Sequence, residues 1–221
     1  MKLLFRAIAK FATGLLLVAA LLFLPAGTLA YPGGWRFIGL LFVPMLILGA
    51  VLFVKSPTLL EKRLNAKEKE GAQKGVLALS ALLFIAGFVV AGLDHRFGWS
   101  SVPPWAIILA SAVLLISYAL YAEVMRENAY LSRTVEVQEG QQVVDTGLYG
   151  IVRHPMYAVT LWLFLSIPVV LGSWWSLLCF APYAAVIILR IYNEEKVLTR
   201  SLPGYAEYKT RVKYRLIPFV W

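Results

Sequence analysis

Residues 156–190 read MYAVTLWLFLSIPVVLGSWWSLLCFAPYAAVIILR, and this stretch decides the fold. It carries no charged residue before Arg190, and it is long enough to cross a bilayer and return, since a spanning helix needs about 20 apolar residues. The pair Gly172-Ser173 divides it into two runs, 156–172 and 174–190, which we interpret as a tight transmembrane hairpin. Polar and titratable residues lie at both ends of this hairpin, and charge beside a bilayer is so costly that it usually serves function.

Composition extends the membrane assignment to the rest of the chain. The 221 residues are 60% hydrophobic, whereas soluble domains are nearer to about 45–50%. The apolar residues are grouped in long runs, which predicts an all-α integral membrane protein with about six transmembrane helices. The four runs that precede the hairpin cover residues 11–30, 37–54, 75–93 and 104–122.

The basic residues are divided unevenly between the two sides of the membrane. When the spans are counted in order, all of the 21 Lys and Arg residues except Arg36 and Arg96 fall on the side of the N-terminus. The positive-inside rule predicts that both termini and the polar groups around the hairpin face the cytosol. The net charge of +9 fits contact with anionic membrane lipids, so no nucleic-acid partner is expected. Basic residues before the first span and small residues at 27–30 also resemble a cleavable signal peptide, whose removal would leave the later topology unchanged.

The chain divides by composition into residues 1–122, with four spans, and residues 123–221, with a polar segment, the hairpin and a tail. Within the polar segment, residues 135–144 read VEVQEGQQVV, and their alternation and central glycine predict a short extended or irregular piece. The tail is expected to continue the last helix, break at residues 202–204 and form a second cytosolic helix.

Residues 147–157, GLYGIVRHPMY, stand directly before the hairpin. Proline fits the first turn of a helix, so His154-Pro155 predicts a helix N-terminus, which favours an anionic group. At the other end, Arg190 and Glu194 share a helix face, and a guanidinium can bind a carboxylate at two points. Taken singly, these residues fit a surface ion pair and interfacial anchors better than a functional site. Their convergence on one hairpin, in a chain without a soluble domain, favours a functional site.

No metal site is expected from the sequence. Cys179 is the single cysteine and falls inside the sixth span. His95 and His154 lie on opposite sides of the membrane in the predicted topology, so they cannot share an ion.

Four motifs in order resemble the isoprenylcysteine carboxyl methyltransferase family, and related membrane phospholipid N-methyltransferases share much of the pattern. They are Gly147-x-Tyr149, Arg153-His154-Pro155-x-Tyr157, Arg190-x-x-x-Glu194-Glu195 and Tyr205-x-x-Tyr208. The resemblance covers residues 123–221, and it departs from the family at Val159, where a glycine is common, which bears on helix packing there.

The resemblance implies that S-adenosyl-L-methionine binds at the cytosolic end of the hairpin. It also implies that Arg190 orients the carboxylate of the substrate and that Glu194 takes part in catalysis. The residues implied in cofactor binding are Gln138, Gln141, Gln142, Val143, Val144, Tyr149, His154, Pro155, Met156, Tyr157, Glu194 and Glu195.

The function expected from this resemblance is carboxyl O-methylation of an isoprenylcysteine-like or other lipidic substrate. A carboxylate is ionised at neutral pH, so this reaction needs no general base. A second alternative is a phospholipid or small-lipid N-methyltransferase, in which Glu194, Glu195 or His154 would accept a proton. A third is a membrane sterol reductase that uses NADPH, with Lys196, Arg200 or Arg211 near the phosphate of the nucleotide, and a non-catalytic membrane protein is also open.

Overall fold

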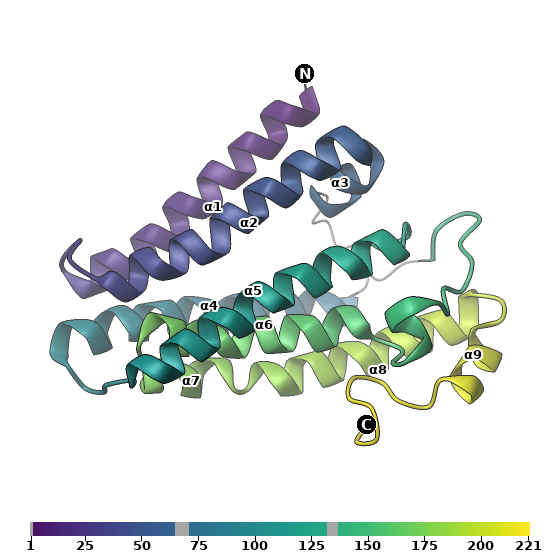
Figure 1. The fold of residues 1–221 in the computed structure, drawn as a ribbon. Helices are drawn as coiled ribbons and strands as arrows, with labels where there is room; N and C mark the ends of the chain where they lie inside the picture. Colours follow the sequence, from purple (N-terminus) through teal and green to yellow (C-terminus); the bar gives the residue numbers. More distant parts are fainter. Residues whose placement is uncertain (1, 65–70, 132–136) are drawn as a thin grey trace.

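The computed structural model describes residues 2–64, 71–131 and 137–221, and every regular element in these ranges is a helix (Figure 1). The α-helices are α1 (Lys2–Ala26), α2 (Pro32–Lys55), α3 (Pro57–Leu64), α4 (Gly71–Phe97), α5 (Pro104–Glu127), α6 (Pro155–Leu171), α7 (Trp174–Phe180), α8 (Tyr183–Ser201) and α9 (Tyr205–Arg211). A 3₁₀ turn, η1 (Gly147–Gly150), precedes α6.

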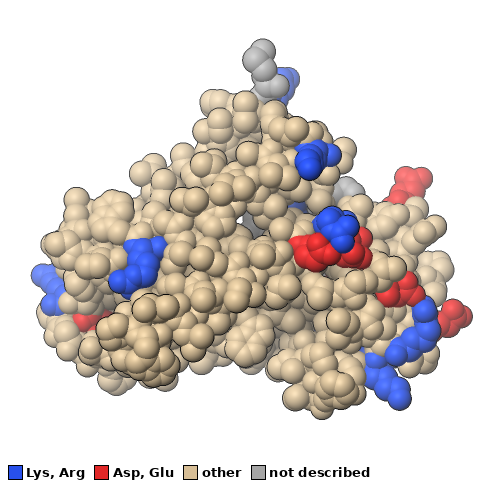
Figure 2. Space-filling view, viewed as in Figure 1, with Lys and Arg blue, Asp and Glu red and all other residues tan. Residues whose placement is uncertain are grey.

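Within the described ranges, five helical segments are long and apolar enough to cross a membrane. They are α1, α2, the part of α4 from Leu77, α5, and α7 with α8 taken together, and α6 adds a shorter apolar helix of 17 residues. The predicted all-α, multi-pass membrane fold is therefore confirmed. Figure 2 agrees with it, because the charged side chains on the visible face lie toward the two ends and leave an uncharged surface between them.

Two of the predicted spans differ from the observed helices. The first was expected over 11–30, but α1 covers Lys2–Ala26, because a helix can continue through basic residues whose long side chains reach the headgroups. The sixth is interrupted at Ala181-Pro182, between α7 and α8, since proline cannot donate the backbone hydrogen bond that a continuous helix requires. The division at residue 122 stays a prediction, and α5 runs across that position.

Close helix contacts in the apolar core depend on glycine. A Cβ on Gly87 of α4 would lie 2.3 Å from the ring of Phe180 in α7, and one on Gly92 would lie 2.5 Å from the carbonyl oxygen of Leu22 in α1. Small residues at such crossings let the backbone of one membrane helix approach the neighbouring helix closely. The aromatic rings of Phe84, Phe88 and Phe180 fill the space beside Gly87.

Buried polar contacts hold together the end of the bundle where α4 meets α5 and α6 meets α7. The Asp94 carboxylate, 1% exposed, accepts hydrogen bonds from the backbone N–H of Ser100 at 2.7 Å and from the hydroxyls of Ser100 and Ser173. This network joins the end of α4 to two connections, α4–α5 and α6–α7, far from the opposite end, where α3, η1 and α9 lie (Figure 1).

The tail after α9 binds the loop that leads into α6. The backbone N–H of Arg153 donates to the carbonyl of Tyr214 in the tail, and that of His154 donates to the carbonyl of Arg215, both at 2.9 Å. The carbonyl oxygen of Trp221 in turn accepts from the N–H groups of residues 215–217, which closes the tail into a hook. The start of α6 is thus fixed from the C-terminal side.

Candidate functional site

A pocket opens at the end of the bundle where η1, α6, α8 and α9 converge. The space in the pocket, counted out to its open mouth and including solvent there, is about 820 Å³. Most residues that the sequence predicts for the site line this pocket: Gln141, Gln142, Val143, Val144, Tyr149, His154, Met156, Tyr157, Arg190 and Glu194.

The first turn of α6 places two of these residues in the pocket. His154 is the N-cap residue of α6 and Pro155 is its first helical residue, as expected for a proline at a helix start. Pro155 does not itself line the pocket, but the turn that it begins directs Met156 and Tyr157 toward it. The ring of His154 stacks on that of Tyr157, with centroids 5.7 Å apart.

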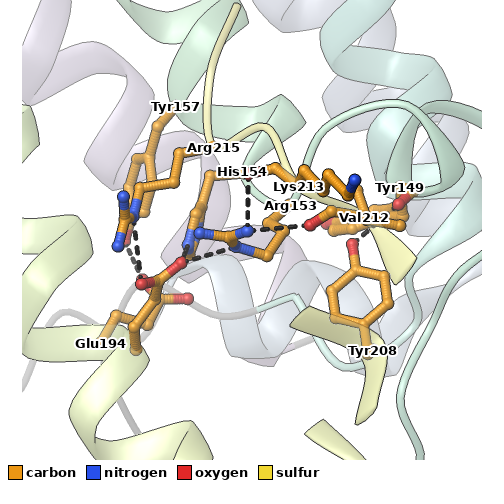
Figure 3. Close-up of polar contacts among 10 residues, drawn as sticks. Tyr149, Arg153, His154, Tyr157, Glu194, Tyr208, Val212, Lys213 and Arg215 are labelled. Carbon is orange, nitrogen blue, oxygen red and sulfur yellow. Dashed lines mark hydrogen bonds and ion pairs between the residues drawn. The ribbon is translucent and has the colours of Figure 1, made fainter. Parts of the chain in front are cut away.

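Arg190 and Glu194 of α8 are joined through a tyrosine of α6. The Nε of Arg190 donates to the Tyr157 hydroxyl at 2.8 Å. That hydroxyl in turn donates to the Glu194 carboxylate (Figure 3). The guanidinium carbon of Arg190 also lies 5.8 Å from the centre of the Tyr157 ring. These contacts link a cation, a phenol and an anion across the two helices, and all three side chains line the pocket.

Glu195 lies behind the pocket and does not line it. Its buried carboxylate accepts from the Nε of Arg153 at 2.8 Å and the Nε of Arg215 at 3.1 Å, and lies 3.3 Å from the Nε2 of His154. Arg153 also donates to the carbonyls of Val212 and Lys213, at 2.8 and 2.9 Å (Figure 3). Successive helix residues point about 100° apart, so Glu194 faces the pocket and Glu195 faces the tail. Its contribution to cofactor binding stays a prediction.

The segment before η1 forms an irregular wall, as expected, although residues 135–136 of the predicted piece lie outside the described ranges. Gln138 stabilises the conformation of this wall through two hydrogen bonds. Its side-chain amide donates to the carbonyl of Tyr130, and its backbone N–H donates to Oε1 of Gln141 at 2.9 Å. Gln138 does not line the pocket, whereas Gln141 does. Gly140 turns the chain with φ +70°, a conformation that favours glycine.

Tyr149 of η1 is held at both ends. Its hydroxyl accepts from Nδ2 of Asn128 at 3.0 Å, and its carbonyl accepts from the hydroxyl of Tyr208 at 2.7 Å. Burial is the main cause that raises the pKa of Tyr149 to about 12, so the phenol is neutral at physiological pH. It therefore offers a flat face and a neutral hydroxyl, and it carries no charge.

The pocket also contains residues to which the sequence analysis gave no catalytic or cofactor-binding role: Asn128, Tyr130, Leu131, Arg153, Leu198, Leu202, Tyr205 and Tyr208. The spacing Tyr205-x-x-Tyr208 places two rings on one helix face, and it belongs to the motifs of the resemblance, although neither tyrosine was assigned to the site. No comparable pattern marks Asn128 or Leu131. In the described part of the chain, no group of three or more His, Cys, Asp or Glu residues is placed to hold a metal ion.

Residues 105–203 match the model of the phospholipid methyltransferase family. Among curated proteins, the chain is 28% identical over 95 residues to an uncharacterised protein of Bacillus subtilis, a match that covers 42% of this chain and 56% of that one. It is 31% identical over 99 residues to the Delta(14)-sterol reductase of Mus musculus, covering 40% of this chain and 22% of the reductase. The matched regions thus span about half of one relative and about a fifth of the other.

The structure also resembles that of the eukaryotic intramembrane Ras methyltransferase, an isoprenylcysteine carboxyl methyltransferase. The TM-score is 0.53 at 21% identity, and the match covers 97% of this chain and 77% of the other. The family resemblance predicted from the motifs is therefore confirmed: the chain has the fold of this membrane methyltransferase, and its C-terminal part matches the phospholipid methyltransferases.

Proposed function

We propose that this protein is an integral membrane methyltransferase that uses S-adenosyl-L-methionine to methylate the carboxylate of an isoprenylcysteine-like or other lipidic substrate. The observation that carries the proposal is that one pocket is lined both by residues of the Arg-His-Pro-x-Tyr segment and by the Arg190–Glu194 face of α8. The residues proposed to bind the cofactor and those proposed to bind the methyl acceptor therefore line the same pocket.

The lining of the pocket suits the proposed cofactor in its chemistry. Its wall offers side-chain amides from Gln141 and Gln142, a flat ring from Tyr149, and a carboxylate from Glu194. A carboxylate can bind the ammonium group or a ribose hydroxyl of such a ligand. When bound, the cofactor supplies a methyl group on a positively charged sulfur, and the carbon–sulfur bond breaks with its electron pair remaining on sulfur.

Arg190 is positioned to orient the acceptor. A guanidinium binds a carboxylate through two parallel N–H···O bonds, which fixes the direction of its oxygens. Tyr157 holds Nε of Arg190 at 2.8 Å, so the guanidinium is supported from one side. An ionised carboxylate oxygen attacks directly and no proton is transferred, so placement and exclusion of water can supply most of the rate enhancement.

A lipidic acceptor would reach the pocket from the bilayer. The helices expose large apolar side chains along their length, as expected for contact with lipid. The uneven distribution of Lys and Arg favours a pocket that faces the cytosol, where a soluble cofactor is available. The acceptor would thus arrive from the membrane and the cofactor from water.

The family match favours a second candidate, N-methylation of a phospholipid or small lipid amine. An ammonium group must lose a proton before it can attack. Among the described residues that line the pocket, Glu194 supplies the carboxylate, so it would be the base. His154 also lines the pocket, but its Nε2 lies 3.3 Å from the carboxylate of Glu195, which does not. The sterol reductase match makes NADPH a third ligand to test.

Calorimetric titration of detergent-solubilised protein with S-adenosylhomocysteine and with NADPH separates these candidates. The methyltransferase proposals predict saturable binding of S-adenosylhomocysteine and none of NADPH. Binding of NADPH alone would refute both and support a reductase.

A further inference from the structure

Five tyrosines line the pocket, and their hydroxyls differ in one respect. Those of Tyr130, Tyr149, Tyr157 and Tyr208 each form a hydrogen bond within the chain. The hydroxyl of Tyr205 is buried and has no hydrogen-bond partner among the residues that the structure describes. The whole residue is only 4% exposed.

A buried hydroxyl without a partner is uncommon, because it loses its bonds to water without replacing them. The pKa of Tyr205 is raised far above its ordinary value, chiefly by burial and further by the carboxylates of Glu195 and Glu194. Tyr205 is therefore protonated and can donate. Since it lies in the wall of the pocket, its partner is to be sought in the bound ligand.

The surroundings of Tyr205 indicate which part of a ligand lies there. Tyr205 packs in an apolar cluster with Leu202, Tyr208 and Val212, against which Val143 and Leu198 also pack. Two ionic groups of the pocket, Arg190 and Glu194, instead meet at Tyr157 of α6. Arg153 also lines the pocket, but its guanidinium is paired with the Glu195 carboxylate and bonded to the Val212 carbonyl. The pocket thus has an apolar, aromatic part and an ionic part.

A nucleoside cofactor has the same division. Its purine is flat and largely apolar with ring nitrogens that accept hydrogen bonds, and its amino-acid end is charged. Aromatic and aliphatic side chains suit the purine, and a well-placed polar group fixes its orientation.

We infer that the part of the pocket around Tyr205 binds the adenine of the cofactor, and that the Tyr205 hydroxyl donates a hydrogen bond to an adenine ring nitrogen. This inference rests on the proposed function, because it assumes an adenosyl ligand. It adds a residue that selects the base, in a segment to which no role was otherwise assigned.

The test compares Tyr205→Phe with wild type by calorimetric titration of two ligands. S-adenosylhomocysteine contains the adenine and the amino-acid end, whereas 5′-methylthioadenosine contains the adenine but lacks the amino acid. The substitution should weaken both about tenfold or more, because the variant loses a buried hydrogen bond. Equal affinity of variant and wild type for both ligands would overturn the inference.

Two control variants separate binding from folding. Tyr214→Phe changes a tyrosine of the tail outside the pocket and should leave both affinities unchanged. Tyr208→Phe removes the bond to the Tyr149 carbonyl and should lower the unfolding temperature without ligand. Tyr205→Phe should leave that temperature unchanged or raise it, since no bond within the described chain is lost. A lowered temperature with unchanged affinity would assign Tyr205 a structural role.

Analogues of S-adenosylhomocysteine in which one ring nitrogen is replaced by CH identify the contact. The analogue that lacks the contacted nitrogen should bind wild type about as weakly as S-adenosylhomocysteine binds Tyr205→Phe. Its affinity should not fall further in that variant. If every analogue is weakened by the substitution as much as the parent compound, the hydroxyl does not contact the base. Absence of S-adenosylhomocysteine binding by wild type would overturn the proposed function, and this inference with it.

Discussion

Glu195→Gln tests whether this residue fixes the site or binds the cofactor. Its side chain is 5% exposed and is paired with Arg153, also 5% exposed, at 2.8 Å, and with Arg215 at 3.1 Å. Removing one member of a buried ion pair typically costs about 3–5 kcal/mol, because it leaves the other charge uncompensated. The amide can still accept a hydrogen bond, so we expect a loss near 3 kcal/mol.

The measurement is thermal unfolding in detergent, with and without S-adenosylhomocysteine. For a chain of this length, 1 kcal/mol corresponds to roughly 2–4 °C, so the unfolding temperature should fall by roughly 6–12 °C. Glu194→Gln is the matched control, since it changes the adjacent carboxylate that faces the pocket. It should weaken ligand binding with little change in the unfolding temperature of the free protein. If Glu195→Gln instead weakens binding and leaves stability unchanged, Glu195 binds the cofactor directly.

Three further predictions concern other parts of the molecule. Arg190→Gln should lower kcat/KM for the acceptor by about tenfold to a hundredfold, with the affinity for S-adenosylhomocysteine nearly unchanged. An equal loss of kcat/KM and of S-adenosylhomocysteine affinity would contradict a role in acceptor binding. Gly147→Ala should destabilise the protein by about 1–3 kcal/mol, because φ is +52° and the new Cβ would lie 2.7 Å from the carboxyl carbon of Glu127; unchanged thermal unfolding would refute this. Asp94→Asn should lower the unfolding temperature because its amide would face donors such as the Ser173 hydroxyl, while S-adenosylhomocysteine affinity stays unchanged; altered affinity would show that the two ends are coupled.

The membrane fold could be predicted from the sequence because hydropathy marks each span directly. The α6 start at Pro155 and the break before α9 could be predicted as well, since proline and glycine have strong local effects. The interruption at Ala181-Pro182 was not predicted, because transmembrane helices often continue through proline when neighbours compensate. Hydropathy likewise does not show where α1 begins.

The candidate site was predicted in part, for a physical reason. Residues near the Arg-His-Pro motif and on the Arg190–Glu194 face are close in sequence to recognisable patterns, and these residues line the pocket. The direction of Glu195 depends on the tail that packs against α8, which no local pattern specifies. The partners of Tyr157 and the isolated hydroxyl of Tyr205 depend on contacts between distant segments, so only the tertiary structure shows them.

Transfer of a labelled methyl group tests the central claim most directly. The purified protein is incubated with methyl-labelled S-adenosyl-L-methionine and an S-farnesylated cysteine that has a free carboxylate and a blocked amine. The account predicts labelled product whose label is released as methanol by alkali, because a methyl ester is hydrolysed by base and an N-methyl group is not. Absence of transfer to this acceptor, with alkali-stable label on a phospholipid amine offered in a parallel incubation, would contradict carboxyl methylation.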